Sequence, residues 1–487
     1  MTARHMPVLV GAGTAMRREE DYTKALEPLE MMIEAVRMAG ADCGNPALLA
    51  DVGRIAVPRG RWRYRNPSGA IAAAIGAAHA QTLLSTVGVL QQSLIASACE
   101  DIANGTIDSA IIAGADAGYR ILRARISGNR APEREQVDDP DVLLQPADEL
   151  RHEAEAAAGL QMPVGLYALA ESARRAQSGR SIDEHRAHLA RVYARFSEIA
   201  AQNPDAWNRE AKSAPEIMEA GRHNPMQAFP YTRFHCSTWN VDQAAALLLC
   251  SEAKADALGI AEAQRIYPVA SAESGHMMPL SARADIAQCI GAQLAAEALY
   301  RHTQIAPDEI DLVELYSCFP IAVECFAEAA RIPADRDLTI TGGMAFAGGP
   351  YNNYFFQATA KAAQLLKAGE GRNALLSCVS GIMTKQAFAL WSVDRPDRSF
   401  ARLDVTEEVA ARSEEREVLL DYAGPGTVAG CTVIHGRGGD NQAVLLIDTG
   451  KGQRAIVTSE DPSVVASIET EEWVGRSVTA IGGRLAA

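Results

Sequence analysis

Cysteine and histidine are the residue types in this chain that could bind a metal or supply a nucleophile. The nine cysteines are scattered and none forms a CxxC pair. That spacing argues against zinc ribbons and thioredoxin-like redox sites, and it fits reduced thiols in a cytoplasmic protein. His185 and His188 are three residues apart on an expected helix and could share a metal. No third ligand accompanies them in the sequence, so a solvated helix face is the favoured interpretation.

Two arginine clusters could bind an anion. Residues 171–195 contain six arginines and three acidic residues, an excess that stands out in a chain of net charge −15. A local basic patch of this kind could bind an anionic ligand, and a solvated helical face is the simpler alternative. The segment 57–69 interleaves four arginines with Trp62 and Tyr64. It could stack against a nucleotide, but packing against other parts of the protein is favoured.

Composition narrows the class of protein. With 487 residues, 48% of them hydrophobic and 22% charged, the chain has the balance of a globular protein with two or three structural units. Its 46 basic and 61 acidic residues argue against nucleic-acid binding. No apolar run reaches about 18 residues, so no membrane span is expected. The apolar run at the N-terminus is too short for a signal peptide, and the segment leads into a predicted strand at 7–10.

The elements that must position any site alternate between strands and helices, which indicates α/β architecture. A helix is predicted around residues 23–39. Residues 86–115 and 346–381 repeat one pattern: a loop, a helix that stops at a glycine, and a strand. The stops, Gly105 and Gly369, suit a left-handed C-terminal cap. The repetition suggests a duplicated α/β half.

Two other regions differ in character. An acidic loop leads into a long helical stretch over 164–201. Beyond residue 396 a charged linker precedes short β-like runs over 425–485, with a short helix expected at 462–468. Four or five short strands around one helix suit a small β-barrel of the oligonucleotide/oligosaccharide-binding type, and small barrels of other kinds stay open. Residues 425–487 are therefore expected to fold as a separable unit.

Four segments, in order over residues 5–400, resemble the thiolase superfamily, especially sterol-carrier-protein-type thiolases and thiolase-like proteins. TIDSAIIAGADA (106–117) resembles the strand after the nucleophile helix. NPMQAFPYTRFHCSTWNVDQAAALLLCSEAKADALG (224–259) resembles the segment that joins the loop domain to the second half. ITGGMAFAGGPYNNY (340–354) and LLSCVSG (375–381) stand where family members carry two catalytic loops.

The resemblance implies an α/β thiolase fold: two similar layered halves with an inserted loop domain. To these the chain adds a small C-terminal β-barrel-like domain. The expected domains are a first half at 1–117, a loop domain at 118–240, a second half at 241–400, and a linker with the β-domain at 401–487.

Most of the family's catalytic residues are replaced in this sequence. A thiolase needs a thiolate nucleophile, a second acid or base, and donors for the oxyanion. The family's nucleophilic cysteine, at the start of the first-half helix, falls here at about Gly88. Cys99 lies about three turns into that helix and is expected to be inert core. The Gly-His-Pro motif, whose histidine lies over the thioester, reads Gly348-Gly349-Pro350.

Two positions could still act chemically. Tyr316 opens the segment YSCF, which replaces the family's Asn-Glu-x-x-Ala or His-Asp-Cys-Phe motif. Its phenol could be an acid or base on an acyl-CoA carbonyl or β-hydroxyl, or it could fill the vacated pocket. Cys378 keeps the cysteine of the family's Cys-x-Gly element, with Ser380 in place of the usual glycine. It is either functional or a small buried residue at a strand end.

The resemblance also implies a coenzyme A (CoA) thioester as the ligand, with no covalent cofactor and no metal. His276 and His235 lie in second-half loops that line the acyl pocket in the family. CoA is expected to lie against the arginine-rich loop domain. The candidate substrate-binding residues are Gly348, Gly349, Ser380, Gly381, His276, Arg174, Arg175 and Arg180.

The expected function is acyl-CoA binding in lipid metabolism in the cytoplasm, with acyl transfer or carbon–carbon bond cleavage or formation on CoA thioesters. Two alternatives stay open: a non-catalytic acyl-CoA-binding or scaffolding protein, and a tyrosine-dependent retro-aldolase on a hydroxyacyl-CoA. Some thiolase-like proteins catalyse the latter reaction with tyrosine in place of cysteine, and they cooperate with a small barrel partner. Family members are usually dimers, so a homodimer is possible as well.

Overall fold

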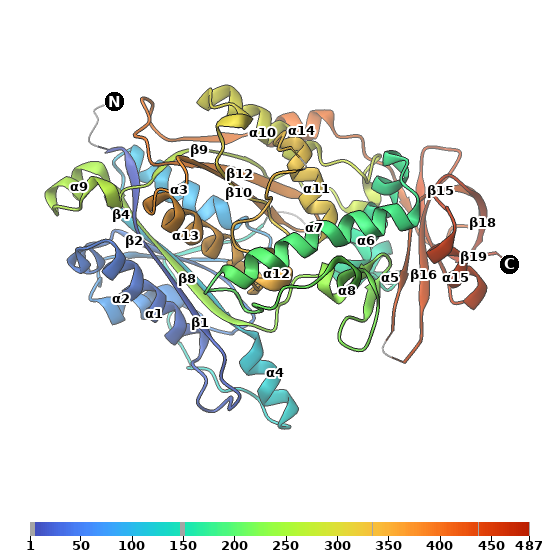
Figure 1. The fold of residues 1–487 in the computed structure, drawn as a ribbon, viewed down its shortest axis with the longest axis horizontal. Coiled ribbons are helices and arrows are strands. Elements are labelled where there is room, and N and C mark those ends of the chain that lie inside the picture. The colour runs from blue at the N-terminus through green and yellow to red at the C-terminus, as the bar shows by residue number, and fades with distance from the viewer. Residues whose placement is uncertain (1–4, 147–150, 334, 437, 487) are drawn as a thin grey trace.

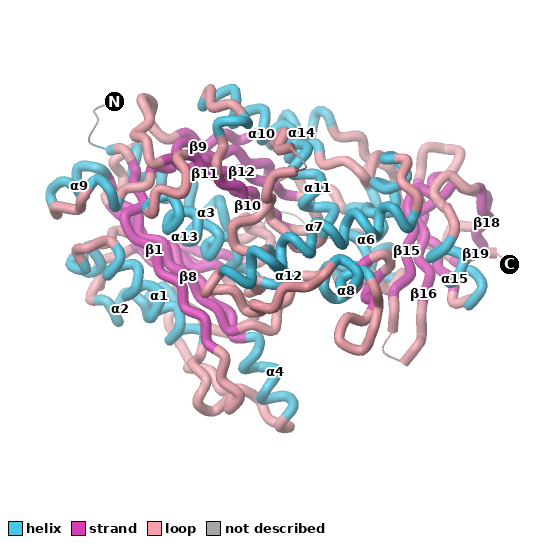
Figure 2. The backbone as a smooth tube through the Cα atoms, in the orientation of Figure 1, coloured by secondary structure: helices cyan, strands magenta, loops and turns pink. Residues whose placement is uncertain are grey.

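The computed structural model describes residues 5–146, 151–333, 335–436 and 438–486. Two mixed sheets with helices between and outside them make up the body, and a barrel stands at one end of the long axis (Figures 1 and 2). This arrangement confirms the predicted layered α/β halves. No helix in the described ranges is both long and apolar enough to cross a membrane.

The first sheet has six strands. Their order is β1 (Pro7–Arg17), β8 (Asp242–Ser251), β4 (Ser109–Ala117), β2 (Arg54–Pro58), β3 (Gln81–Ser85) and β5 (Val142–Leu144). β8 lies between β1 and β4 and is antiparallel to both. The chain therefore returns to the first sheet after the loop region. The expected start of the second half at residue 241 lies before β8, which still belongs to the first sheet.

The second sheet has five strands in the order β10 (Leu312–Glu314), β11 (Asn373–Ser380), β12 (Lys385–Ser392), β9 (Tyr267–Ser274) and β13 (Ala401–Asp404). β13 pairs in parallel with β9. Residues 401–404, expected to belong to a linker, thus complete this sheet.

Two helices lie between the sheets and contact both: α3 (Gln91–Ala103) and α13 (Tyr354–Lys367). These are the helices of the repeated pattern, and Gly105 and Gly369 follow them with φ of 74° and 78°, as the sequence predicted. Outer helices cover the other faces. They are α1 (Pro28–Asp42) and α2 (Pro67–Ile75) on the first sheet, and α10 (Ile290–Thr303) and α11 (Pro320–Ala329) on the second.

The segment 57–69 packs inside the first half. Trp62 and Tyr64 are almost fully buried, at 3% and 1% exposure, in the core formed by α1 and the first sheet. The Tyr64 hydroxyl donates a hydrogen bond to Glu27 at 2.9 Å. The favoured prediction of structural packing is therefore confirmed for both aromatic residues.

The loop region carries two long helices, α6 (Pro163–Ser178) and α7 (Ile182–Gln202). The sequence predicted one continuous helical stretch, but Gly179 adopts a left-handed φ of 70° and ends α6. Ser181 then starts α7 through a capping box with Glu184. Shorter elements complete the chain: α4 (Gly118–Ile126), α5 (Glu153–Ala157), α8 (Ala214–Met218), β6 (Met226–Ala228), β7 (Tyr231–Thr232), α9 (Glu252–Ala257), α12 (Gly343–Phe346), α14 (Thr406–Arg412) and β14 (Val418–Leu419).

The C-terminal region contains a closed barrel of five strands. In pairing order they are β15 (Gly424–Ile434), β16 (Gln442–Asp448), β17 (Arg454–Ser459), β19 (Arg484–Leu485) and β18 (Ser477–Ile481), which returns to β15. α15 (Pro462–Thr470) lies where the sequence predicted a short helix. The predicted small barrel is confirmed.

The barrel is packed on the body. β6 of the loop region pairs with β15 through Ala228 and Ile434. α6 packs on β15 at Gly430, where a Cβ would come within 2.7 Å of the Leu169 carbonyl oxygen. The side chains of Val444, Leu446 and Ile456 join the main hydrophobic core of the body.

Candidate active site

Cys378 lies near the carboxyl end of β11 and faces the start of α3. Its side chain is fully buried. Burial raises the pKa of the Cys378 thiol to about 12, although the backbone N–H groups of Gln91 and Gln92 act in the opposite direction. The thiol is therefore neutral near pH 7, and a neutral thiol is a poor nucleophile.

Tyr316 meets Cys378 at the same helix start. Its backbone N–H donates to the Ser377 hydroxyl at 2.9 Å, which ties it to the strand that carries Cys378. Its phenol oxygen accepts a long hydrogen bond from Gln91 Nε2 at 3.4 Å. Burial raises the pKa of Tyr316 well above its ordinary value, and the nearby Cys378 adds to the shift. The phenol stays protonated, so it can donate a hydrogen bond or a proton.

No cysteine stands at the start of α3. Gly88 has a left-handed φ of 101°, Leu90 is the N-cap residue, and Gln91 is the first helical residue. The Gln91 side chain turns back and accepts a hydrogen bond from the Phe355 backbone N–H at 2.7 Å. Cys99 is fully buried in the core, as predicted, and burial raises the pKa of its thiol.

A buried acid lies behind Tyr316. The Glu314 carboxylate ends β10 and accepts hydrogen bonds from the backbone N–H groups of Ile340 and Thr341 and from the Tyr354 hydroxyl. The Tyr354 ring packs edge-on against Tyr316, with centroids 5.6 Å apart. Burial raises the pKa of Glu314. Sequence reasoning missed Glu314, Tyr354 and Gln91; the one available signal was an acidic residue at the end of an apolar strand.

The predicted glycine loop is closely packed. Gly348 has a φ of 107°, and a Cβ there would lie 2.2 Å from Gln243 Oε1. At Gly349 a Cβ would lie 1.9 Å from the Ser237 hydroxyl oxygen. Both glycines are buried. The backbone at these two positions has no room for a side chain.

Ser380 ends β11, and Gly381 begins the turn to β12. Gly381 has a φ of 67°, and its carbonyl accepts a hydrogen bond from the Tyr167 hydroxyl at 3.3 Å. The Ser380 carbonyl accepts from the Thr384 hydroxyl at 3.2 Å. Through Tyr167, helix α6 therefore contacts the turn that follows Cys378.

The three predicted CoA-binding arginines are already paired with carboxylates. Arg174 pairs with Glu328 and lies 3.7 Å from Glu324. Arg180 also pairs with Glu324, at 3.2 Å. A phosphate would have to compete with these partners.

Arg175 is also paired with a carboxylate, which belongs to the C-terminal region. It forms an ion pair with Glu472 of the C-terminal region at 2.6 Å. This guanidinium therefore links α6 to the barrel region.

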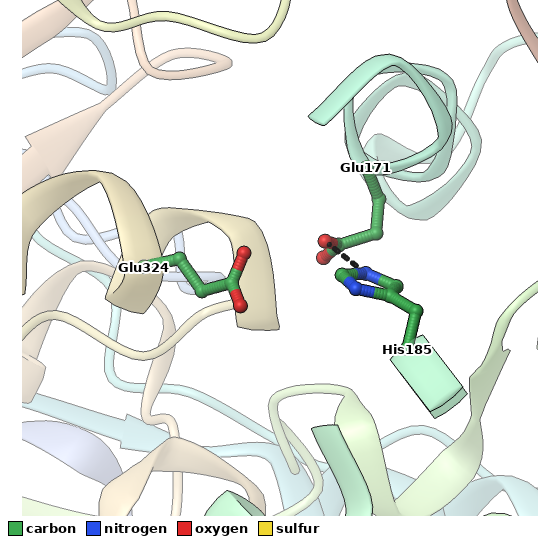
Figure 3. A group of neighbouring side chains, drawn as sticks. All are labelled: Glu171, His185 and Glu324. Atoms are coloured by element: carbon green, nitrogen blue, oxygen red, sulfur yellow. Dashed lines mark hydrogen bonds and ion pairs between the residues drawn. The ribbon is translucent and has the colours of Figure 1, made fainter. Parts of the chain in front are cut away.

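His185 does not lie on a solvated helix face; that prediction is wrong because α7 packs His185 against α6 with 1% exposure. His185 Nε2 lies 2.8 Å from the Glu171 carboxylate, and His188 Nε2 lies 2.8 Å from Glu324 (Figure 3 shows Glu171, His185 and Glu324). The Tyr231 hydroxyl also donates to Glu171.

This cluster has donor atoms that could hold a metal, because those of Glu171, His185 and Glu324 lie within 4.8 Å of one another. Its carboxylates are, however, already satisfied. Burial opposes ionisation of Glu324, yet the His188 bond and neighbouring cationic groups lower its pKa to about 2. With Arg174 and Arg180 supplying positive charge, the cluster is a closed hydrogen-bond network between α6, α7 and α11.

The two predicted pocket histidines differ. His235 is buried, and burial lowers its pKa to about 3. His276 lies after β9 and lines a hollow of about 280 Å³. Neither Cys378 nor Tyr316 lines that hollow.

Comparison with known sequences gives partial matches. No protein-family model matches the chain. The acetyl-CoA acetyltransferase of Methanocaldococcus jannaschii is 33% identical over 94 residues, 19% of this chain and 24% of that protein. The acetyl-CoA acetyltransferase of Methanothermobacter thermautotrophicus is 30% identical over 185 residues, 38% of this chain and 44% of that protein. The chain thus matches less than half the length of these curated relatives.

Solved structures match a larger part of the chain than the curated sequences do. A monomeric SCP2-thiolase-like protein type 1 from Mycobacterium smegmatis is 25% identical, with a TM-score of 0.83 and 100% of both chains covered. The Ltp2-ChsH2(DUF35) aldolase is 17% identical, with a TM-score of 0.61, over 81% of this chain and 100% of that one. Human mitochondrial 3-ketoacyl-CoA thiolase in complex with CoA is 14% identical, with a TM-score of 0.56, over 81% and 99%. At these identities the last two show a shared fold alone.

Proposed function

Because the chain belongs to the thiolase superfamily, we propose that it binds a CoA thioester with the reacting carbonyl at the start of α3. The observation that carries the proposal is the convergence of Tyr316 and Cys378 on this helix start. The first backbone N–H groups of a helix have no partner within the helix and can stabilise an oxyanion. A protonated Tyr316 phenol can donate to the same oxygen.

The proposed chemistry is acyl transfer or carbon–carbon bond cleavage or formation without a covalent acyl-enzyme. Gly88, Leu90 and Gln91 at the helix start carry no nucleophile, and Cys378 is a neutral buried thiol. We place this reaction in the lipid metabolism of the cytoplasm. The nine free cysteines suit a reducing compartment.

The direct test combines calorimetry with mass spectrometry. CoA, acetyl-CoA and acetoacetyl-CoA should bind, and the intact protein should show no acyl adduct after incubation with either thioester. Thiolysis of acetoacetyl-CoA should stay near background. An acyl adduct on any cysteine would contradict the proposal, and so would a lack of binding by all three compounds.

CoA is proposed to lie against the loop region, with its phosphates near Arg174 and Arg180. These side chains would exchange carboxylate partners for phosphate. The affinity should therefore weaken with salt, because exposed phosphate contacts are screened. Arg174→Ala and Arg180→Ala should each weaken CoA binding, and exposed Arg372→Ala should leave it unchanged. Equal affinities in all three variants would remove the arginines from the site.

A tyrosine-dependent retro-aldolase is the second candidate function, favoured by Tyr316 and by the fused barrel. In that reaction a base takes the proton of the β-hydroxyl, the Cα–Cβ bond breaks, and the thioester enolate is then protonated. The high pKa of Tyr316 suits it to the acid role. A screen of β-hydroxyacyl-CoA compounds would separate this activity from a non-catalytic binding or scaffolding protein, which would show no turnover.

A further inference from the structure

The hollow at His276 lies apart from Tyr316 and Cys378. It is formed by the loop after β9, the start of α10, the turn between β11 and β12, and α14. Its lining includes His276, Arg283, Cys289, Met383 and Gln386. A space of about 280 Å³, open to solvent, is large enough for a small organic ligand.

Arg283 brings a positive charge to this hollow, and the buried Glu155 carboxylate acts on it from beyond ion-pair distance. Its Nε and Nη2 atoms donate to the carbonyls of Met278 and Ile382. In the described ranges no carboxylate oxygen lies within 4.0 Å of the Arg283 guanidinium, the limit for an ion pair. Burial lowers the pKa of Arg283. A half-buried guanidinium without a carboxylate in contact is costly, so a bound carboxylate would stabilise it.

Two acidic residues also line the hollow, but neither neutralises Arg283. Asp285 accepts hydrogen bonds from the Gln177 amide and from the Ala287 backbone N–H. Glu414 is exposed to solvent. Neither forms an ion pair with Arg283 in the part of the chain that the structure describes.

The start of α10 adds to the positive field. Cys289 is the N-cap residue of this 14-residue helix, and its side chain makes no capping hydrogen bond. The first turn contains no acidic residue. The positive end of the helix dipole is therefore uncompensated, which favours an anion at this position.

Gln386 adds a requirement for a hydrogen-bond donor. It is 3% exposed and lines the hollow. Its Nε2 donates to the Met383 carbonyl, but its Oε1 has no hydrogen-bond partner in the described structure. His276 Nε2 is also buried without a partner there. A buried acceptor without a donor is costly, and a ligand hydroxyl would satisfy it.

We propose that this hollow binds a small hydroxycarboxylate. The carboxylate pairs with Arg283 and the start of α10, and the hydroxyl donates to Gln386 Oε1. The proposal concerns a free acid and does not depend on the CoA function, so either can fail alone.

Calorimetry on the full chain with three matched probes tests the ligand class. The probes are 3-hydroxybutyrate, butyrate and 1,3-butanediol. The hydroxy acid should bind roughly two- to tenfold more tightly than butyrate, the factor for one net hydrogen bond. The uncharged diol should not bind measurably. Equal affinities of the two acids, an absence of binding by both, or tight binding of the diol would each overturn the proposal.

Two variants and one control test the residues. Gln386→Leu should abolish the preference for the hydroxy acid and leave butyrate binding in place. Arg283→Gln should weaken both acids roughly tenfold or more, the effect of a lost charged hydrogen bond. Arg372→Gln removes an exposed arginine paired with Asp394 outside the hollow and should change nothing. Because Arg283 also holds two carbonyls, thermal unfolding must show that its variant is folded; the comparison of probes on the natural chain decides the ligand class in any case. A folded Arg283→Gln variant with unchanged affinity would refute the site.

Discussion

At the scale of single residues, Tyr316 separates a catalytic protein from a binding protein. Tyr316→Phe removes the hydroxyl that Gln91 contacts at 3.4 Å and leaves the ring against Tyr354. Turnover of a CoA thioester should fall on the order of 10²- to 10⁴-fold, the span for a lost acid or base. The melting temperature should scarcely change, because one long hydrogen bond is lost and no packing.

Tyr300→Phe is the matched control for this change. The Tyr300 hydroxyl donates to the Ala330 carbonyl at 2.7 Å in the outer helices, away from Tyr316. Steady-state rates of this variant should equal those of the natural chain. Full activity in Tyr316→Phe would show that Tyr316 only fills the pocket.

The buried thiols predict that the folded protein loses stability at alkaline pH. Burial raises the pKa of Cys250, Cys318, Cys378 and Cys431 to about 12 each. An exposed thiol in the unfolded chain loses its proton near pH 8.5. The unfolded state therefore binds fewer protons above that pH, and the free energy of unfolding should fall from about pH 9 to pH 12.

Urea unfolding at stepwise pH measures this loss. Alkylation with iodoacetamide at pH 8 gives a parallel readout: Cys378 should react only after denaturation, and peptide mass spectrometry identifies it. Rapid labelling of Cys378 in the folded protein would show that the thiol is accessible and ionised.

The sequence named Tyr316 and Cys378 as candidates, and their catalytic role stays a prediction. Tyr316 and Cys378 meet because Tyr316 follows β10, Cys378 lies near the end of β11, and these two strands pair in parallel. The ion pairs of Arg174 and the burial of His185 could not be predicted. Their partners, Glu328 and Glu171, are set by how α6 packs on α7 and α11, which is long-range packing that no local pattern encodes.

At the scale of elements, local sequence signals predicted helix ends and barrel strands, but they did not predict which sheet a distant strand joins. The glycine stops of α3 and α13 and the five barrel strands have turn residues and periodicity of their own. The placement of β8 in the first sheet depends on pairing with β1, more than 200 residues earlier. The break between α6 and α7 was missed because both helices have similar amphipathic patterns on either side of Gly179.

Arg454 of β17 makes several polar contacts between barrel and body. It is 1% exposed, pairs with Asp448 at 2.7 Å, and donates to the carbonyls of Ser281, Arg283 and Ala284. Arg454→Met should lower the free energy of unfolding by about 3 kcal/mol, because it leaves these acceptors and Asp448 without their donor. Urea unfolding measures the loss. Arg476→Met, which breaks an exposed pair with Glu471 in the same region, should cost less than about 1 kcal/mol.

At the scale of the whole molecule, β5 bears on the oligomeric state. β5 pairs in parallel with β3 and occupies one edge of the first sheet, and β1 occupies the other. β5 has three residues, and short edge strands discourage pairing with a second copy. The chain should therefore be a monomer in solution rather than the homodimer that the resemblance allowed. Light scattering coupled to size-exclusion chromatography at micromolar concentrations checks this, and a mass of twice 52.0 kDa would contradict it.

Removal of the barrel tests how far the C-terminal region is a unit of its own. The barrel has its own core, around Val433, Leu445 and Val457, so residues 425–487 should express as a folded fragment. The body should fare worse, because the cut removes Val444, Leu446 and Ile456 from the main core and uncovers the face of α6 that contacts β15. A chain that ends at residue 424 should therefore aggregate, because newly exposed apolar patches promote association. Sedimentation and circular dichroism of the two fragments measure both outcomes. A soluble, cooperatively folding body would show instead that the barrel is an appended module whose contacts with α6 contribute little to stability.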